Sequence, residues 1–423
     1  MTKPKAKRRK RHTVSLFTGA GGMDFGFEAA GFETSVAVEM DHDACETLRA
    51  NRAFPILERR IETIPSQELL DAAGLRKGEV DLLIGGPPCQ PFSKSAYWSK
   101  GDTRRLEDPR ANTLWEYMRC VEELQPTVFV LENVYGLGYV GKSEGLNLLV
   151  RLTEELNQRS GARYRISKKL INTAGYGVPQ IRERFFLVAH RDGLQFSFPP
   201  TTHRTNDDDD AQTTLFSSER LDPVTAWDAI GGMTPDPSEE LAVRGAWQEL
   251  LPSIPEGENY LWHTKRKGGK PLFGWRSRYW SFLLKLAKAK PSWTIQAQPG
   301  PAIGPFHWEN RRLSTVEMAA LQTFPSGLRF VGNRGSVQKQ IGNAVPSLVT
   351  EVLGREIRRQ HFEDSVSGPL KLAVTLQRPI PRAERVKPVP KKFLHLQADH
   401  PDYDDVRKEA KRKLAVSVAG GLV

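Results

Sequence analysis

Between residues 13 and 200, short apolar runs alternate with longer stretches of mixed polarity. The apolar runs have the length and the β-branched or aromatic content of strands, and the stretches between them are long enough for helices. This alternation is typical of an α/β domain with a parallel sheet. The clearest predicted strands are Val14–Phe17, Ser35–Glu39, Val80–Ile84, Thr127–Leu131 and Arg184–Ala189.

Helical spacing of apolar residues predicts a helix at Thr113–Leu124, with Cys120 on or near its core face. A capping signal, in which Ser314 can cap and Glu317 can reach back, predicts the start of another helix. The two C-terminal helices are predicted at Ser314–Gln322 and Val345–Arg358.

The pattern changes beyond residue 198. Residues 199–218 are polar and include an aspartate run, which is typical of a linker. Residues 220–308 are rich in Trp, Pro and Gly, and beyond about residue 364 the chain loses periodicity. No apolar run approaches the roughly 20 residues of a membrane span. No apolar stretch follows the N-terminal charges, so no secretory signal is predicted.

The formal net charge of +11 belongs to the two ends of the chain. Residues 1–12 carry +7 and residues 364–423 carry +5, which leaves about −1 for residues 13–363. Such basic tails are either solvated chain or attract polyanions. The cysteines, Cys45, Cys89 and Cys120, are too few and scattered for a disulfide framework or a zinc site. We therefore expect no metal, and a reducing cytoplasm.

One of these cysteines stands at the end of a predicted strand, within Gly85-Gly86-Pro87-Pro88-Cys89-Gln90. The glycines end the strand and the prolines restrict the backbone that follows. A thiol at this point lies at the carboxyl edge of the sheet, where α/β proteins bind ligands. A small buried hydrophobe is the alternative, but the surrounding prolines and polar residues favour a nucleophile.

Two further strand ends carry groups suited to ligand binding. The turn that contains Gly19, Gly21 and Gly22 precedes a helix, and Glu39 ends the next strand at a spacing suited to ribose hydroxyls. An adenosine-bearing cofactor fits this pair; a dinucleotide fits less well, because Asp24 replaces the third glycine. A tight turn beside a surface acid is the alternative.

Charged residues also flank two other predicted strands. Glu132 follows an apolar run and is expected at the same sheet edge as Cys89, unless it is a helix cap or a surface acid. Arg182 and Arg184 alternate along an extended segment and are expected to face one side, toward an anionic or carbonyl-bearing substrate. A surface ion-pair network is the other interpretation of the two arginines.

Together these segments resemble the DNA (cytosine-5) methyltransferases of restriction–modification systems. The resemblance covers residues 14–358 and rests on six blocks in the family's order: Leu16–Gly22, Gly86–Ser93, Glu132–Val134, Gln180–Arg184, Arg311–Ser314 with Leu321–Pro325, and Gln340–Pro346. It implies a Rossmann-like methyltransferase sheet with helices on both faces and a smaller target-recognition domain. The implied division is a disordered tail at 1–12, a catalytic and cofactor domain at 13–198 completed by 335–360, a linker and recognition domain at 199–334, and a basic tail at 361–423.

The resemblance also implies residue roles. Cys89 would attack C6 of a flipped-out cytosine, Glu132 would contact N3 and the exocyclic amine, Arg184 would hold O2, and Arg182 would support the loop and the phosphate backbone. The methyl donor would be S-adenosylmethionine, held by Phe17, Gly19, Gly21, Gly22, Glu39, Ile61, Pro87 and Asn343. The family commonly has Asp-Ile where this chain has Arg60-Ile61, so an acidic contact to adenine is missing.

A basic segment lies within the implied recognition domain. Residues 260–290 carry nine Lys or Arg, no acid and several aromatics, so we expect a local positive surface. The predicted DNA contacts are Lys265, Arg266, Lys267, Lys270, Arg276, Arg278, Gln90 and Ser93, with Arg276 and Arg278 as candidates for base edges. The expected partners are double-stranded DNA and a cognate restriction endonuclease acting on the same site, and we expect a monomer in a prokaryotic, nucleoid-associated cytoplasm.

Three alternatives remain open from the residues. A C5 methyltransferase acting on tRNA would share the catalytic blocks, although the long 220–308 region favours DNA. A catalytically inactive DNA-binding regulator would require lost catalytic positions, and all of them are present. A nicotinamide oxidoreductase leaves the missing third glycine and Cys89 unexplained.

Overall fold

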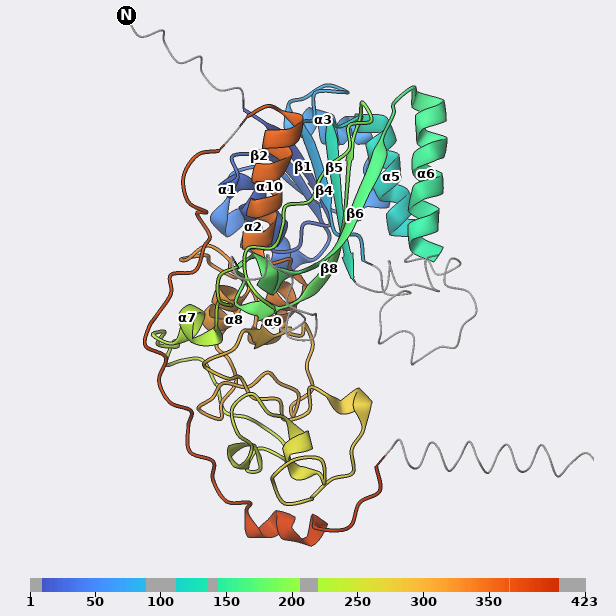
Figure 1. Ribbon diagram of the computed structural model, residues 1–423. Helices are drawn as coiled ribbons and strands as arrows, with labels where there is room; N and C mark the ends of the chain where they lie inside the picture. Colours follow the sequence, from blue (N-terminus) through green and yellow to red (C-terminus); the bar gives the residue numbers. More distant parts are fainter. Residues whose placement is uncertain (1–9, 89–111, 135–143, 206–219, 365, 403–423) are drawn as a thin grey trace, which may run out of the picture.

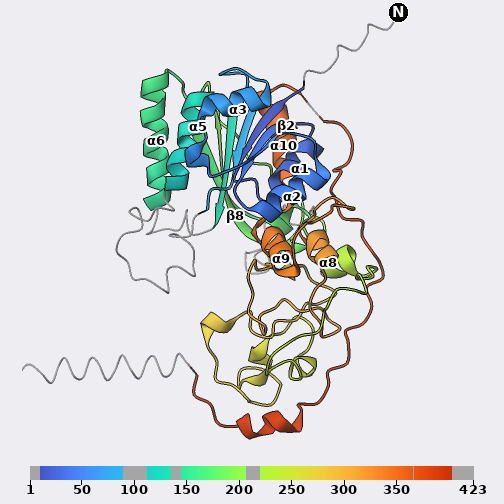
Figure 2. The same ribbon diagram turned by 180° about the vertical axis from the view of Figure 1, so that it is seen from behind.

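The computed structural model describes residues 10–88, 112–134, 144–205, 220–364 and 366–402. Its N-terminal domain is built on a seven-stranded sheet (Figures 1 and 2). In spatial order the strands are β3 (Ile56–Glu58), β2 (Glu33–Glu39), β1 (His12–Leu16), β4 (Leu82–Gly85), β5 (Val128–Val134), β8 (Glu183–His190) and β6 (Arg165–Asn172).

Helices cover both faces of this sheet (Figure 1). Successive strand residues point to opposite faces, so Leu83 packs with one hydrophobic cluster and Leu82 with the other. The first cluster includes side chains of α3 (Ser66–Ala73), α5 (Asn112–Leu124) and α6 (Glu144–Ser160). The second includes side chains of α1 (Gly22–Ala29) and α10 (Ser347–His361), and α2 (His42–Asn51) lies near the β3 edge.

One strand departs from the predicted parallel sheet. β8 is antiparallel to both of its neighbours, β5 and β6. The connection from β6 to β8 contains only the short helix η5 (Thr173–Tyr176) and the strand β7 (Gln180–Ile181), too little chain for a helical crossover. The expectation of an all-parallel sheet was therefore wrong at this position, whereas the α/β fold with helices on both faces is confirmed.

The helix predictions agree with the structure to within a few residues. α8 (Thr315–Leu321) begins with a capping box in which Ser314 and Glu317 exchange hydrogen bonds. Cys120 lies in α5 and is completely buried, as its place near the core face predicted. Within the described ranges, no helix combines the length and apolar character needed to cross a membrane.

The chain returns to the first domain after it has built the second. α10 packs directly on α1, and Gly26 permits this close approach because a Cβ there would collide with Thr350 and the backbone of Ser347. The Ser347 hydroxyl donates to the Gly22 carbonyl over 2.8 Å. The sheet domain is thus completed by residues close to the end of the matched blocks.

The smaller domain has little regular structure (Figure 1, lower half). Its cohesion comes from a hydrophobic cluster that includes Leu250, Ile254, Tyr260 and Leu283. A parallel pairing of β7 with β9 joins it to the sheet domain. The elements of this half are α7 (Ala226–Ile230), η8 (Leu251–Ser253), η9 (Tyr260–His263), η10 (Ser277–Tyr279), β9 (Ser292–Trp293), α8 and α9 (Arg334–Asn343), while η1 (Ile61–Thr63) belongs to the sheet domain.

Residues 366–402, called the strap below, run along both domains (Figures 1 and 2). Leu370 and Leu372 pack against the sheet domain's second cluster. Further along, Gln377 donates to Asp228 of α7 over 2.9 Å, and Glu384 pairs with the buried Lys288 at 2.8 Å. The strap includes one short helix, η11 (Lys391–Leu396).

The strap's aromatic anchor completes the core of the smaller domain. Phe393 of η11 is buried and stacks on Trp247 with ring centroids 5.7 Å apart. The sequence interpretation treated the region after residue 364 as a tail without periodicity, either solvated or polyanion-binding. Residues 366–402 nevertheless pack on both domains. They do so mainly as extended chain, and extended chain needs no periodic pattern of apolar residues.

Asp24 in α1 is a buried acid whose ionisation opposes folding. Its carboxyl accepts from Ser15 at 3.1 Å and from Thr34 at 3.3 Å, and burial raises the pKa of Asp24 to about 7. Because the unfolded acid ionises near pH 3.8 and the folded one near 7, stability is lost as the pH rises between these values. We expect Asp24→Asn to gain about 2–4 kcal/mol relative to the parent between pH 4 and pH 8.

Urea unfolding of both proteins at the two pH values measures this difference. Glu79→Gln is a suitable control, because the Glu79 side chain is exposed to solvent. A difference between parent and Asp24→Asn that does not change with pH would contradict a raised pKa at Asp24.

Candidate active site

The ends of β4 and β5 bring Glu132 beside the segment that leads to Cys89. Gly85 of β4 pairs with Leu131 of β5, so Glu132 lies next to Gly86. A Cβ on Gly86 would be 3.0 Å from the Glu132 Oε2 atom. Asn133 donates from its side chain to the Pro87 carbonyl over 3.2 Å. Cys89 itself, with Gln90 and Ser93, lies outside the described residues.

Two of the residues predicted to contact cytosine, Glu132 and Arg184, form an ion pair. Arg184 Nε lies 2.8 Å from Glu132 Oε1, and the two side chains retain only 14% and 10% of their accessible surface. Burial raises the pKa of Glu132, and the positive charges of Arg184 and Arg182 lower it in part. A carboxyl in this setting can take up a proton and share it with a ring nitrogen. Arg184 keeps N–H groups available beside it.

Arg182 takes a different position from the one expected. It is 1% exposed and donates to the carbonyls of Ile295, over 3.3 Å, and Gly342, over 2.6 Å. A side chain in this place cannot meet a phosphate backbone, so that part of the expectation needs correction. Through these two bonds Arg182 links the chain just before β8 to the smaller domain at Ile295 and to α9 at Gly342. This structural position agrees with the other part of the expectation, support of the loop.

The turn after β1 leaves room for a ligand. Gly19 and Gly21 have φ values of +56° and +82°, and Phe17 also has a positive φ of 53°. These values are costly for residues with a Cβ, which explains the glycines. A Cβ on Gly19 would meet nothing within 4 Å, so open space adjoins the backbone there. Gly22, by contrast, is packed against the Val345 carbonyl and begins α1.

Glu39 closes this space from the neighbouring strand. Its Oε2 accepts from the Gly19 amide over 2.7 Å, and its Oε1 accepts from the amides of Met40 and Asp41, each over 2.8 Å. A carboxylate offers about four lone-pair positions, so at least one remains for a hydroxyl group. The carboxylate is thus held in place by the backbone while it retains acceptor capacity.

The remaining residues expected at the cofactor differ in accessibility. Pro87 is buried, Ile61 is only 3% exposed within the core, and Asn343 is exposed at the end of α9. Arg60, at the position of the missing acid, pairs with Glu62 at 3.0 Å.

Sequence reasoning missed Met40, whose side chain is 66% exposed directly after Glu39. A large apolar residue following a strand-ending acid was the available signal.

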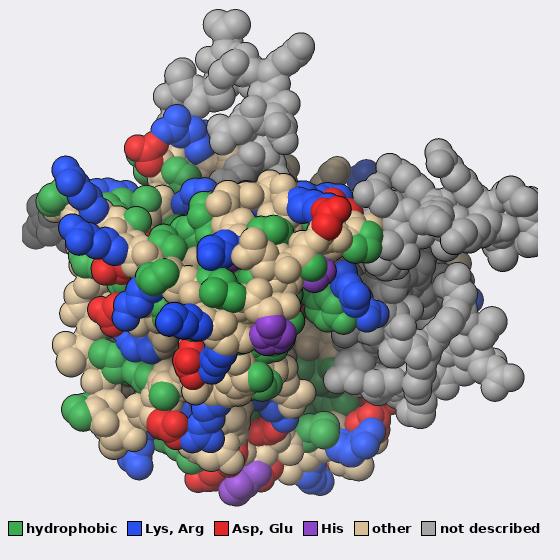
Figure 3. All heavy atoms as spheres, turned by 90° about the horizontal axis from the view of Figure 1, so that it is seen from below, with side chains coloured by type: hydrophobic (Ala, Val, Ile, Leu, Met, Phe, Trp, Pro, Cys, Tyr) green, Lys and Arg blue, Asp and Glu red, His purple; other side chains and the backbone are tan. Residues whose placement is uncertain are grey.

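The basic segment is more nearly neutralised than its composition suggested. Lys265 pairs with Asp399, Arg266 pairs with Asp402 at 2.8 Å, and Lys267 pairs with Glu258 at 3.2 Å. Lys285 and Lys288 are only 3% exposed, so they do not contribute to a positive surface. Lys270, Arg276 and Arg278 remain exposed. Figure 3 shows basic and acidic side chains interspersed over the described surface seen from below.

The expected local positive surface is therefore reduced by acidic partners. The segment itself contains no acids, but the chain supplies them from residues before and after it. Local composition does not report such partners, because they are brought in by tertiary packing. Arg276 and Arg278 are exposed at η10, where Arg278 also donates to the Tyr279 hydroxyl over 3.0 Å, and Lys290 is exposed further along the segment.

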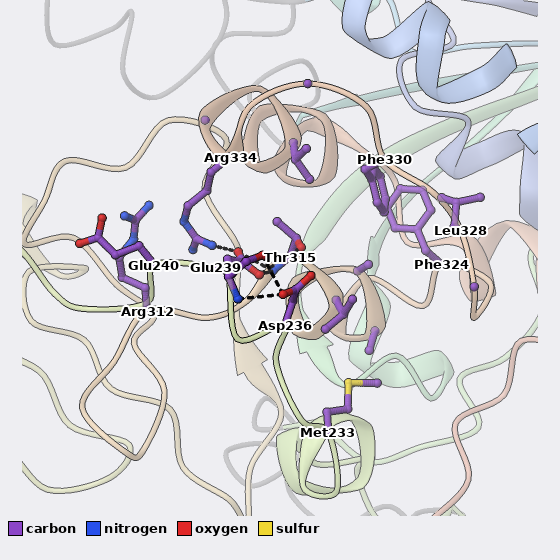
Figure 4. A pocket seen from close by; sticks show the side chains of 18 of the residues that line it. Met233, Asp236, Glu239, Glu240, Arg312, Thr315, Phe324, Leu328, Phe330 and Arg334 are labelled. Carbon is purple, nitrogen blue, oxygen red and sulfur yellow. Dashed lines mark hydrogen bonds and ion pairs between the residues drawn. The ribbon is translucent and has the colours of Figure 1, made fainter. Parts of the chain in front are cut away.

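A cavity of about 860 Å³ lies elsewhere, between the segment 233–240 and the helices α8 and α9 (Figure 4). Several of its polar groups pair with one another: Glu239 pairs with Arg334 and accepts from the Thr315 backbone amide over 3.1 Å. None of the residues expected to bind cofactor or cytosine lines it. The described residues that were predicted to bind cytosine or the cofactor lie mainly near the carboxyl ends of β1, β2, β4 and β5, away from this cavity.

Comparison with known proteins agrees with this geometry. Residues 12–359 match the family model of C-5 cytosine-specific DNA methylases. Type II methyltransferase M.SacI of Streptomyces achromogenes is 41% identical over 372 residues, which cover 82% of this chain and 92% of that protein. Type II methyltransferase M.NgoFVII of Neisseria gonorrhoeae is 34% identical over 346 residues, which cover 80% of this chain and 83% of that protein.

Solved structures show the same fold. A DNA modification methyltransferase encoded within a prophage (E. coli) has a TM-score of 0.56 at 24% identity, covering 82% of this chain and 99% of that chain. A mutant DNMT2 of Spodoptera frugiperda has a TM-score of 0.55 at 17% identity, covering 84% of this chain and all of the other. With the family match over most of its length, the chain belongs to the C-5 cytosine-specific DNA methylases.

Proposed function

We propose that this enzyme transfers a methyl group to C5 of a flipped-out cytosine in a specific duplex DNA sequence, through a covalent bond between Cys89 and C6. The observation that carries the proposal is the buried Glu132–Arg184 pair beside Gly86. Only Pro87 and Pro88 separate Gly86 from Cys89, so the thiol belongs to the segment that follows this pair. C5 and C6 are inaccessible within a base stack, which makes extrusion of the base necessary.

The pair supports each step of the addition. The Cys89 thiolate forms a bond to C6, and the electron pair of the C5–C6 double bond moves toward C5 as charge develops on N3 and O2. Glu132 in its protonated form donates to N3 and accepts from the exocyclic amine, while Arg184 donates to O2. C5 then takes the methyl group, a base removes the C5 proton, and the C6–S bond breaks as the double bond re-forms.

S-adenosylmethionine, when bound, supplies the electrophilic methyl group. The open space at Gly19 and the acceptor capacity of Glu39 fit its amino-acid end and its ribose hydroxyls. Phe17, Ile61 and the exposed Met40 are the candidates for contact with adenine, with Asn343 and Pro87 at the periphery. Gly21 and Gly22 shape the turn that lets the backbone approach.

Lys270, Arg276 and Arg278 are the exposed cations that we assign to DNA, together with Lys265, Arg266 and Lys267 once their acidic partners are displaced. Gln90 and Ser93, near the nucleophile in sequence, are assigned to the same partner. We propose in addition a monomeric, cytoplasmic enzyme that protects host DNA from a cognate endonuclease; the similarity to Type II methyltransferases supports the protective role.

Covalent trapping tests this function. Because the recognised sequence is not defined, the substrate is genomic DNA of a methylation-free host carrying 5-fluorocytosine, incubated with S-adenosylmethionine. The parent enzyme should form a denaturation-resistant adduct, and Cys89→Ser should form none. Sequencing for 5-methylcytosine after expression in the same host then locates the site. An adduct that persists in Cys89→Ser would overturn the assigned nucleophile.

A further inference from the structure

The end of the strap occupies cations of the smaller domain. Asp399 pairs with Lys265, and Asp402 pairs with Arg266 at 2.8 Å. Arg266 also lies over the Trp275 ring, 3.8 Å from its centroid. Two carboxylates thus take the positions that anionic oxygens of another molecule would need in order to reach the same two cations.

This contact adjoins the exposed cations around η10. A Cβ on Gly274 would lie 2.8 Å from the Pro401 carbonyl, so the strap's end rests against the backbone that leads to Arg276. In Figures 1 and 2 the strap's end and the short gold helix η10 appear on the same side of the smaller domain. The paired cations Lys265 and Arg266 and the exposed cations at η10 therefore lie close together on the surface of the smaller domain.

The end of the strap follows an anchored segment, and its two acids differ in exposure, since Asp402 retains only 20% of its side-chain accessible surface. Phe393 is buried in the smaller domain's core, and the Ala398 amide donates to the Pro271 carbonyl over 3.3 Å. Asp399, in contrast, retains 88% of its side-chain exposure. Exposed ion pairs contribute only about 0–1 kcal/mol, so such a pair can be exchanged for another anion. Anchoring keeps the carboxylates at high local concentration after displacement.

We propose that Asp399 and Asp402 compete with DNA phosphates for Lys265 and Arg266, so that the strap lowers the enzyme's affinity for DNA. The inference rests on the proposed function, which assigns these cations to DNA. Duplex DNA is favoured as the competing partner because its phosphates present closely spaced negative charges beside Lys270, Arg276 and Arg278. Exchange of partners needs no rearrangement of the strap's anchored part.

The double variant Asp399→Asn/Asp402→Asn tests the competition. We measure its affinity for a fluorescent duplex of mixed sequence by anisotropy over a series of salt concentrations. Loss of the two carboxylates should raise affinity by about threefold to tenfold at low salt and steepen the slope of log K against log salt by about 1–2. The melting temperature should stay unchanged, since the anchor at Phe393 is intact.

A charge-matched control separates this effect from a general gain in positive charge. Glu249→Gln/Asp71→Asn also removes two acids, one of which pairs with the strap at Lys392 and neither of which pairs with the two cations. The inference is overturned if the control raises affinity and salt slope as much as the test variant does, or if the test variant changes neither.

A third variant distinguishes the two proposals. Lys265→Gln/Arg266→Gln should weaken DNA binding, and adding the two aspartate changes to it should have no further effect. If the glutamine variant binds as the parent does, the assignment of these cations to DNA fails and the competition fails with it. If it binds more weakly but the aspartate changes alone have no effect, only the competition fails.

Discussion

Glu132→Gln is expected to lower kcat by about 10²–10⁴, because the glutamine amide cannot carry the proton that a carboxyl shares with cytosine N3. The buried pair with Arg184 explains why this position is sensitive. Burial raises the pKa of Glu132, which favours the protonated form that the reaction uses. Parent activity should therefore fall as the pH rises through that pKa, and the residual activity of the glutamine variant should lack this fall.

Single-turnover transfer from labelled S-adenosylmethionine measures the effect on the chemical step. Cofactor binding by calorimetry should be unchanged, since Glu132 lies on the cytosine side of the site. Glu183→Gln provides a matched control, because this exposed acid lies on β8 next to Arg184. Equal rates for parent and Glu132→Gln would remove Glu132 from the mechanism.

Arg182→Ala is expected to destabilise the fold by about 3–5 kcal/mol, because it leaves two buried carbonyls without donors and creates a cavity. The carbonyls belong to Ile295 and Gly342, which come from different parts of the chain. Arg182→Lys should lose less, since it keeps the charge, but one ammonium group cannot reproduce the spread of a guanidinium. Activity should fall with stability in both variants.

Urea unfolding followed by fluorescence measures this loss. Arg165→Ala, at an exposed position of β6, should change stability by no more than about 0.5 kcal/mol. If Arg182→Ala unfolds at the same urea concentration as the parent, the two carbonyl bonds contribute nothing, and Arg182 has no role as a structural tie.

Much of the site could be predicted because its residues follow strand ends. The period of apolar residues located β1, β2, β4 and β5, and parallel strands place their carboxyl ends at one edge. Glu39 and Glu132 were therefore expected at that edge; the structure places Glu39 at the last residue of β2 and Glu132 two residues before the end of β5. The capping pattern at Ser314 likewise involves residues only three apart, so it could be recognised without tertiary information.

What could not be predicted depends on distant partners. The contact of Arg184 with Glu132 requires that β8 pairs with β5 in an antiparallel register. The short connection between β6 and β8 suggests the antiparallel direction, but the residue types do not specify the register. The burial of Arg182 follows from α9 and the segment at Ile295. Lys265 and Arg266 are neutralised by acids more than a hundred residues further along the chain.

The packing of α10 on α1 also has a consequence for synthesis on the ribosome. α1 is translated more than 300 residues before α10, the helix that covers it, which ends at His361. The hydrophobic cluster of the smaller domain is complete only after Phe393 has been translated. Domains fold as units as they are completed, so the sheet domain needs residues up to His361 and the smaller domain needs Phe393 before either can fold. Prematurely terminated chains should therefore expose apolar surface instead of retaining a working half-enzyme.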